Sequence, residues 1–224
     1  MKKILEVCCG SLTDVIHAVE GGAERIELCT ALSVDGLTPS TGLTEQVRRM
    51  FPTLLLHVLI RPREGCFVYN EEEKEVILRD IRHAVAVGAD AIVSGALTKE
   101  GDIDIPFVRR MIEDCGACPL TFHRAFDVCR DPLHALLVLK ELGVGRILTS
   151  GQQLTAEEGI PLLRQLVRVA EGSPIIIPGG GVNSSNVQKI IRETGVHEIH
   201  GSCRNGTAST VTTEVAKILS LINF

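Results

Sequence analysis

Tryptophan is absent from the 224-residue sequence, and tyrosine occurs once. Nucleic-acid-binding surfaces combine basic stripes with aromatic side chains, whereas this chain has a formal net charge of −5 and no block of basic residues. No apolar stretch approaches the ~18–20 residues of a membrane span. We therefore expect a protein that binds neither nucleic acid nor membrane.

The N-terminus also lacks the pattern of a secretory signal. Lys2 and Lys3 are followed by an apolar run that Glu6 ends after two residues, where a signal peptide needs ~7–15. This pattern indicates a cytoplasmic protein. The eight cysteines would then be reduced thiols rather than disulfides.

A repeated unit runs along the chain. Gly21-Gly22, Gly88, Gly143 and Gly195 each follow an apolar helical stripe and precede a short apolar strand. Glycine adopts the left-handed conformation that ends many helices. The repeated unit is αβ, so we expect parallel strands joined by helical crossovers.

Eight strands follow from this unit, and they are predicted at 4–8, 25–29, 54–60, 90–94, 119–123, 146–149, 174–178 and 197–200. Thr155-x-x-Glu158 indicates a capping box, and Asp131-Pro132 indicates the start of a helix. We predict an α/β fold, a (β/α)8 TIM barrel that forms a single domain over residues 1–224. An open doubly wound sheet is the alternative, but Cys8-Cys9-Gly10-Ser11 after the first strand does not match its glycine-rich fingerprint.

Polar side chains share one face of the predicted strands. Because side chains alternate along a strand, the apolar face should meet the helices and the polar face should point into the barrel. The inward set is Glu6, Cys8, Arg25, Glu27, Cys29, His57, Arg61, Thr121, His123, Glu198 and His200. Barrel interiors are usually filled by Val, Ile and Leu. This set therefore indicates either a buried ion network or a polar site at the carboxyl ends of the strands.

Two cysteines of the inward set end adjacent strands. Cys8 and Cys29 could bind Cu(I), which prefers soft thiolate ligands, or they could be inert buried thiols. Cys66, Cys129 and Cys203 lie in loops at the same end, and the sequence does not define their roles. Cys115-Gly116-Ala117-Cys118 joins a helix end to a strand start on the opposite rim, which favours a structural role over a redox motif.

A second set of residues favours an anion site. Gly179, Gly180 and Gly181 follow the seventh strand and Gly201-Ser202 follows the eighth, where barrels bind phosphate through backbone N–H groups. A tight turn that needs positive φ is the alternative explanation. The candidate guanidinium partners are Arg61, Arg63 and Arg124, although the parity of Arg124 is opposite to that of His123 and favours an outward direction.

The same end of the barrel carries candidate acid–base groups, namely Glu6, Glu27, His123 and Asp127. No Ser-His-Asp order, H-E-x-x-H motif or Walker loop accompanies them. The residues therefore do not name a reaction.

Several segments resemble the CutC copper homeostasis family. They are Glu6-Val7-Cys8, Arg25-Ile26-Glu27-Leu28-Cys29, Gly36-Leu37-Thr38-Pro39-Ser40, Ile60-Arg61-Pro62-Arg63, Thr121-Phe122-His123-Arg124-Ala125-Phe126-Asp127, Ile147-Leu148-Thr149-Ser150-Gly151 and Gly179-Gly180-Gly181-Val182. The resemblance covers residues 1–202. It implies a cytoplasmic (β/α)8 barrel that forms a homo-oligomer (dimer or tetramer), serves copper tolerance and binds Cu(I).

The chain departs from the family pattern at three places. Cys66 stands where the family more often has Asp, Asp35 stands where Gly is common, and the stretch 203–211 is short. Three hypotheses remain open. The first is copper homeostasis through Cu(I) held by Cys8 and Cys29, and the second is an enzyme that acts on a small anionic ligand such as a phosphorylated compound. The third is a structural barrel with a vestigial site.

Overall fold

The computed structural model describes residues 2–223 and alternates strands with helices along the whole chain. The strands are β1 (Ile4–Cys9), β2 (Arg25–Leu28), β3 (Leu55–Leu59), β4 (Ala91–Ser94), β5 (Leu120–Phe122), β6 (Arg146–Thr149), β7 (Ile175–Pro178) and β8 (Glu198–Gly201). The α-helices are α1 (Leu12–Glu20), α2 (Thr41–Met50), α3 (Glu71–Val87), α4 (Ile105–Cys115), α5 (Pro132–Glu141), α6 (Ile160–Ala170), α7 (Val187–Thr194) and α8 (Thr212–Ile222).

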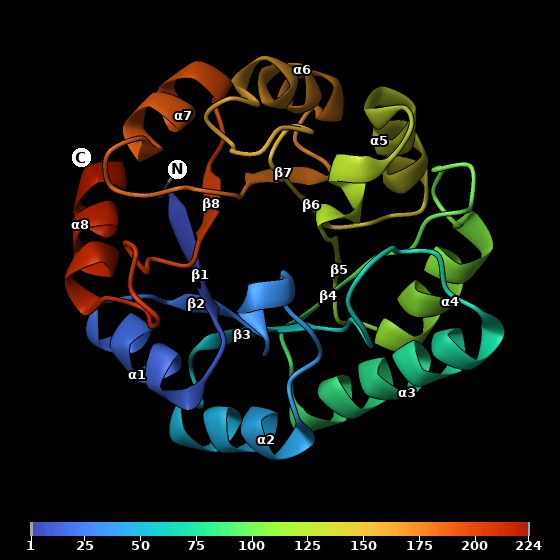
Figure 1. Cartoon of the computed structure of the whole chain (residues 1–224), viewed down its shortest axis with the longest axis horizontal. Helices are drawn as coiled ribbons and strands as arrows, with labels where there is room; N and C mark the ends of the chain where they lie inside the picture. The colour runs from blue at the N-terminus through green and yellow to red at the C-terminus, as the bar shows by residue number, and fades with distance from the viewer. Residues whose placement is uncertain (1, 224) are drawn as a thin grey trace.

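The strands form a nearly closed parallel barrel inside a ring of helices (Figure 1). Their order in the sheet is β7-β6-β5-β4-β3-β2-β1-β8. β7 and β8 are the two ends of this sheet, and among the described strands no hydrogen-bonded ladder joins them. The predicted (β/α)8 barrel is confirmed.

Local sequence signals act at the helix ends as expected. Gly88 and Gly195 have φ values of 95° and 79°, and their N–H groups bond to carbonyls of the helices that they end. The Asp131 carboxylate accepts hydrogen bonds from the N–H groups of Leu133 and His134, at the start of α5. Thr155 and Glu158 form both reciprocal bonds of a capping box, but α6 begins only at Ile160, so the box closes the turn before that helix.

The alternation of side chains along the strands separates two environments. Apolar residues such as Val7, Ile26 and Leu28 are fully buried in the main core with the helices. A small apolar cluster of Cys8, Cys29, Leu59 and Val93 forms separately from that core. The buried charged residues of the strands, including Glu6 and Arg25, belong to the inward set that the sequence predicts.

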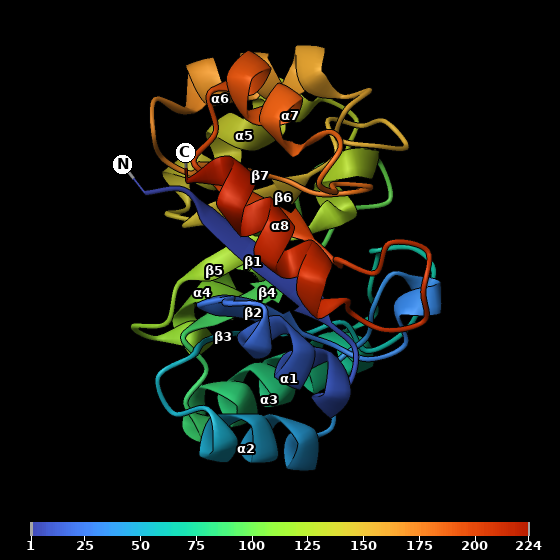
Figure 2. The same cartoon turned by 90° about the vertical axis from the view of Figure 1, so that its left-hand side faces the viewer.

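Short 3-10 helices shape the carboxyl end of the barrel. η1 (Leu32–Val34) follows β2 and η2 (Arg124–Val128) follows β5. Figure 2 shows η1 at the same end of the barrel as the loop between β8 and α8. Within residues 2–223, no helix is both long and apolar enough to cross a membrane.

Candidate functional site

An ion network fills the barrel interior. Arg25 on β2 contacts Glu6 on β1 at 3.0 Å and Glu198 on β8 at 2.6 Å. Arg146 on β6 contacts the same Glu198 carboxylate at 2.9 Å, and His57 contacts Glu6 at 2.6 Å. Burial opposes the ionisation of Glu6, but the His57 charge and the hydrogen bonds from both histidines that it contacts hold its pKa well below the usual range. The inward charged residues of this layer therefore form a buried ion network, which is the first of the two interpretations that the sequence allows.

A pocket of about 390 Å³ lies at the carboxyl ends of the strands. This volume falls within the range of ~300–1,000 Å³ that is common for small-molecule sites. Its lining combines thiol, carboxylate, imidazole and guanidinium groups with loop backbone, contributed by Cys8, Glu27, Leu32, Asp35, Leu59, Arg61, Phe67, His123, Arg124, Asp127, Val128, Leu148, Gly180, Gly181, Val182, His200, Gly201 and Ser202. At the carboxyl ends of the strands, the inward residues therefore form a polar pocket, which is the second of the two interpretations.

The predicted thiol pair lies together in the barrel. The Sγ atoms of Cys8 and Cys29 are 3.8 Å apart, and both residues are buried. One potential ligand atom from each of Cys8, Glu27 and His200 lies within 4.8 Å of the others, which makes this group a candidate metal site. The hydrogen bond with Cys29, and then burial, raises the pKa of the Cys8 thiol well above its ordinary value.

His200 is the residue of this group whose role the sequence analysis missed. It stands opposite Glu6 in the β1–β8 register, and its Nδ1 lies 2.9 Å from Glu6 and 3.3 Å from Glu27. Burial lowers its pKa, but the Glu27 charge and its hydrogen bonds with Cys8 and Glu6 outweigh burial and raise the pKa well above the ordinary value. Strand parity predicts the inward direction of His200, but the preference of Cu(I) for thiolates pointed only to the cysteines as ligands.

The two predicted glutamates occupy different layers. Glu27 lines the pocket, and burial raises its pKa to about 7, although the His200 charge acts in the opposite direction. Glu6 is 1% exposed and is not among the residues that line the pocket. Glu27 is thus placed to contact a ligand, whereas Glu6 holds His57 and His200 in position.

His123 follows β5 and lines the pocket, and one of its two imidazole nitrogens has no hydrogen-bond partner among the described residues. Its Nδ1 accepts a hydrogen bond from the Ala125 N–H at 3.3 Å, which places the proton of the neutral ring on Nε2. Burial, and then the Arg61 charge, lowers the pKa of His123 to about 3. Nε2 is buried without a partner among the described residues. Gly95 makes room for the ring, because a Cβ there would lie 2.9 Å from Nδ1.

Arg124 faces the pocket because it lies on η2 and not on a strand, so strand parity does not apply to it. Its Nε bonds to Asp127 at 2.7 Å and one terminal nitrogen bonds to the Ser150 hydroxyl at 3.1 Å. Asp127 also accepts bonds from the Thr149 hydroxyl and from the N–H and hydroxyl groups of Ser150. The Asp127 carboxylate is therefore committed to anchoring Arg124 and the loop after β6.

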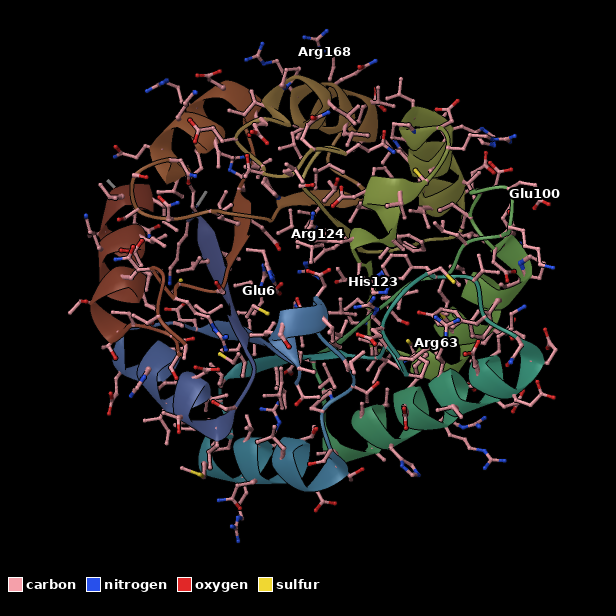
Figure 3. The ribbon with its side chains drawn as sticks, viewed as in Figure 1. Glu6, Arg63, Glu100, His123, Arg124 and Arg168 are labelled. Atoms are coloured by element: carbon pink, nitrogen blue, oxygen red, sulfur yellow. The ribbon has the colours of Figure 1, made fainter. Side chains whose placement is uncertain are left out.

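The other two arginines differ in their distance from the pocket. Arg61 lines it and is 4% exposed, and its terminal nitrogens bond to the carbonyls of Val34, Gly36 and Gly65. Its Nε has no partner among the described residues. Arg63 instead pairs with Glu73 on α3 and does not line the pocket. Figure 3 shows Arg124 and His123 inside the ring of helices and Arg63 further out.

The predicted glycine loops border the pocket. Gly180 and Gly181, with φ of 101° and 68°, and Ser202 line it, whereas the Gly179 N–H bonds to Thr149 and completes the β6–β7 pairing. The turn interpretation and the anion interpretation are therefore compatible. Asp35, which also lines the pocket, has a left-handed φ of 66°, a conformation that glycine adopts readily.

The remaining cysteines do not join the thiol pair. Cys66 is exposed, and Cys129 and Cys203 are buried, but none of the three lines the pocket. Cys115 ends α4 and Cys118 precedes β5, as predicted. Burial raises their pKa values to about 12 and about 11, which suits inert thiols.

Comparison with solved structures supports the fold and identifies a related barrel. A Streptococcus agalactiae crystal structure, provisionally named a copper homeostasis protein CutC, aligns with a TM-score of 0.85 at 36% identity, covering 89% of this chain and 98% of that one. The 3-hexulose-6-phosphate synthase of Salmonella typhimurium aligns with a TM-score of 0.69 at 17% identity, covering 99% and 98% of the two chains. The second likeness shows the fold alone.

Sequence comparison gives the family. A "family protein CutC" of Bacteroides thetaiotaomicron is 47% identical over 210 residues, covering 93% of this chain and 84% of the relative. The human "copper homeostasis protein cutC homolog" is 44% identical over 202 residues, covering 90% and 74%. The sequence profile described as CutC family matches residues 3–205. The chain therefore belongs to the CutC family.

Proposed function

We propose that this protein serves copper homeostasis by binding Cu(I) as its cargo through Cys8 and Cys29. The observation that carries the proposal is the 3.8 Å separation of the two Sγ atoms beside a pocket that opens at the end of the barrel. Cu(I) is a soft ion that favours thiolate ligands, and two thiols this close could bind one ion together.

The neighbouring groups refine this site. The His200 imidazole lies in the same cluster as Cys8 and is a suitable third ligand for copper. The Glu27 carboxylate is a hard oxygen donor, so its role would be to orient His200 rather than to bind Cu(I). A third ligand from His200 would be secondary to the thiol pair.

Titration with Cu(I) under reducing conditions, against a competing Cu(I) chelator, tests the proposal. The wild-type chain should bind about one ion, and Cys8→Ser with Cys29→Ser should abolish binding because only hard oxygen donors would replace the thiolates. Cys115→Ser with Cys118→Ser, on the opposite rim, is the matched control and should bind normally. Equal affinity of the Cys8/Cys29 variant and the wild type would disprove the proposal.

Two further properties belong to the same proposal. We place the protein in the cytoplasm, because a Cu(I) site made of free thiols needs a reducing compartment. We also propose a homo-oligomer, a dimer or tetramer. Sedimentation equilibrium measures the mass of the assembly, and a monomer at micromolar concentration would contradict it.

One observation favours a second candidate function, an enzyme that acts on a small anionic substrate. A copper carrier does not need His123, a residue of the pocket lining whose buried Nε2 has no partner among the described residues. In an enzyme, His123 would donate a hydrogen bond to substrate and Glu27, with a pKa of about 7, would exchange protons. Glu6 and Asp127 would act as positioning residues, because other protein groups already occupy their carboxylates.

A further inference from the structure

The mouth pocket carries hydrogen-bond donors that the thiol pair does not use. Gly180, Gly181 and Ser202 line the pocket, and within residues 2–223 their backbone N–H groups donate to no backbone carbonyl. These N–H groups belong to the loops after β7 and β8, two neighbouring elements of the barrel wall. Such clustered backbone N–H groups bind oxyanions.

A guanidinium lies directly against these loops. The Cζ atom of Arg124 is 3.7 Å from the position that a Cβ on Gly180 would take, so the guanidinium is in van der Waals range of the loop after β7. The bonds to Asp127 and Ser150 hold Arg124 in place, and its other terminal nitrogen has no partner among the described residues. Arg124 thus brings a fixed positive charge to the N–H cluster.

Two buried side chains of the same pocket also have free donors. His123 Nε2 and Arg61 Nε belong to residues that are each 4% exposed, and the described residues provide neither nitrogen with a partner. A buried polar atom without a partner is costly, so these two atoms indicate a polar ligand in the pocket. The Phe67 ring lies 4.9 Å from the His123 ring and 5.0 Å from the Arg61 guanidinium, which fixes both side chains.

The acidic groups divide the pocket into two regions. Glu27 lies with His200 and Cys8, so an anion next to it would be repelled. Asp127 is paired with Arg124, so the region beside Arg124 and the loop after β7 is the favourable one for negative charge. The anion therefore belongs next to Arg124 and away from the Glu27 carboxylate.

We propose that this pocket binds a small phosphate monoester, with its phosphate on the Gly180, Gly181 and Ser202 N–H groups and Arg124, and its organic part facing His123 and Arg61. The ligand's hydroxyl or carbonyl oxygens would accept the hydrogen bonds of His123 Nε2 and Arg61 Nε. This assignment deepens the second candidate function by naming its substrate class, and it does not depend on copper.

Calorimetric titration at low salt tests the site with inorganic phosphate, glycerol 3-phosphate and ribose 5-phosphate. The wild-type chain should bind at least one of the monoesters more tightly than inorganic phosphate. Arg124→Ala should weaken monoester binding roughly tenfold or more, because it removes a charge-assisted bond. Arg168→Ala, on the outer surface of α6 (Figure 3), is the matched control and should bind as wild type.

Two further variants keep the test decisive if Arg124→Ala does not fold. Arg124→Lys keeps the charge but loses the bond to Asp127 or Ser150, and it should bind the monoesters with intermediate affinity. His123→Phe keeps a ring beside Phe67 but loses the Nε2–H donor, so it should weaken monoesters and leave inorganic phosphate unchanged.

Copper titration of the same variants separates this proposal from the first. Arg124→Ala and His123→Phe should bind Cu(I) as wild type does. Absence of binding by every phosphate probe, or equal monoester affinity in wild type and the Arg124 variants, would overturn the phosphate site whatever copper does. Binding of inorganic phosphate with the monoesters no tighter would show a site for the free ion and overturn the monoester.

Discussion

At the scale of single residues, Glu27 is a carboxyl group kept in a costly environment. Its folded pKa of about 7 lies above the ordinary glutamate value of ~4.3 in an unfolded chain. As the pH rises between these two values, the unfolded chain loses the proton before the folded chain does, so the folded state becomes less stable.

Glu27→Gln should therefore stabilise the protein in a pH-dependent way. The gain in unfolding free energy should be near zero at pH 4 and should rise to at most about 4 kcal/mol at pH 8, because glutamine cannot ionise. Urea denaturation across this range measures it. Glu24→Gln, in an exposed pair with Lys2, is the control and should show little pH dependence. A gain that is the same at both pH values would contradict the assigned shift.

Which site residues sequence reasoning could find depended on where each side chain lies. The inward positions of Cys8, Cys29 and Glu27 were predictable because strand alternation fixes the direction of a side chain on or next to a strand. Arg124 lies on η2 and Arg63 is held by Glu73, so no period indicates which of the two faces the pocket. Loop conformation decides these positions, and it depends on contacts from distant segments.

At the scale of elements, glycine caps divide the chain into its repeated units. The sequence predicted all eight strands, four of them from the glycine that precedes each and the other four from the segments between these, and the differences are of one residue at some ends. It did not show how α6 begins, because the Thr155–Glu158 box closes the turn that directly precedes the helix. A capping pattern shows where a turn forms, whereas tertiary contacts decide whether a helix continues from it.

Gly88→Ala should destabilise the protein by about 1 kcal/mol, since its φ of 95° strains any L-residue. Space is not the cause, because the nearest atom to an added Cβ is 3.7 Å away, on Arg48. Gly42→Ala, in the first turn of α2 with open space around it, is the matched control and should stabilise by up to about 1 kcal/mol. Thermal melts of both variants would show shifts of opposite sign; equal shifts would contradict the backbone explanation.

At the scale of the whole molecule, the sheet does not close through its backbone. Within residues 2–223, β7 and β8 share no ladder, whereas Glu198 on β8 bonds to Arg146 on β6 and to Arg25 on β2. Side-chain charge thus connects β8, at one end of the sheet, to β6, the strand next to the other end, through the interior. A sequence pattern of equal strands gives no indication of which neighbouring pair lacks the ladder.

Glu198→Gln should lower the free energy of unfolding by about 3–5 kcal/mol, because it removes the counter-charge of Arg146 and one of the two counter-charges of the buried Arg25. The two arginines outweigh burial and lower the pKa of Glu198, so its contribution is complete above the ordinary glutamate pKa and is lost as the pH falls. The variant should therefore lose most unfolding free energy at neutral pH.

Hydrogen exchange should accelerate first in β7 and β8, and uniform acceleration would contradict the role of Glu198 in closure. Lys189→Ala, which removes an exposed ion pair, should cost under about 1 kcal/mol.

The gap between β7 and β8 gives the barrel the mechanics of a split ring. Bending can concentrate at this one position, because elsewhere around the circumference continuous hydrogen bonding resists it. The loops that carry Gly180 and Ser202 extend from opposite sides of the gap. A molecule bound to both loops would act as a clasp, so occupancy of the mouth and stiffness of the ring would rise together.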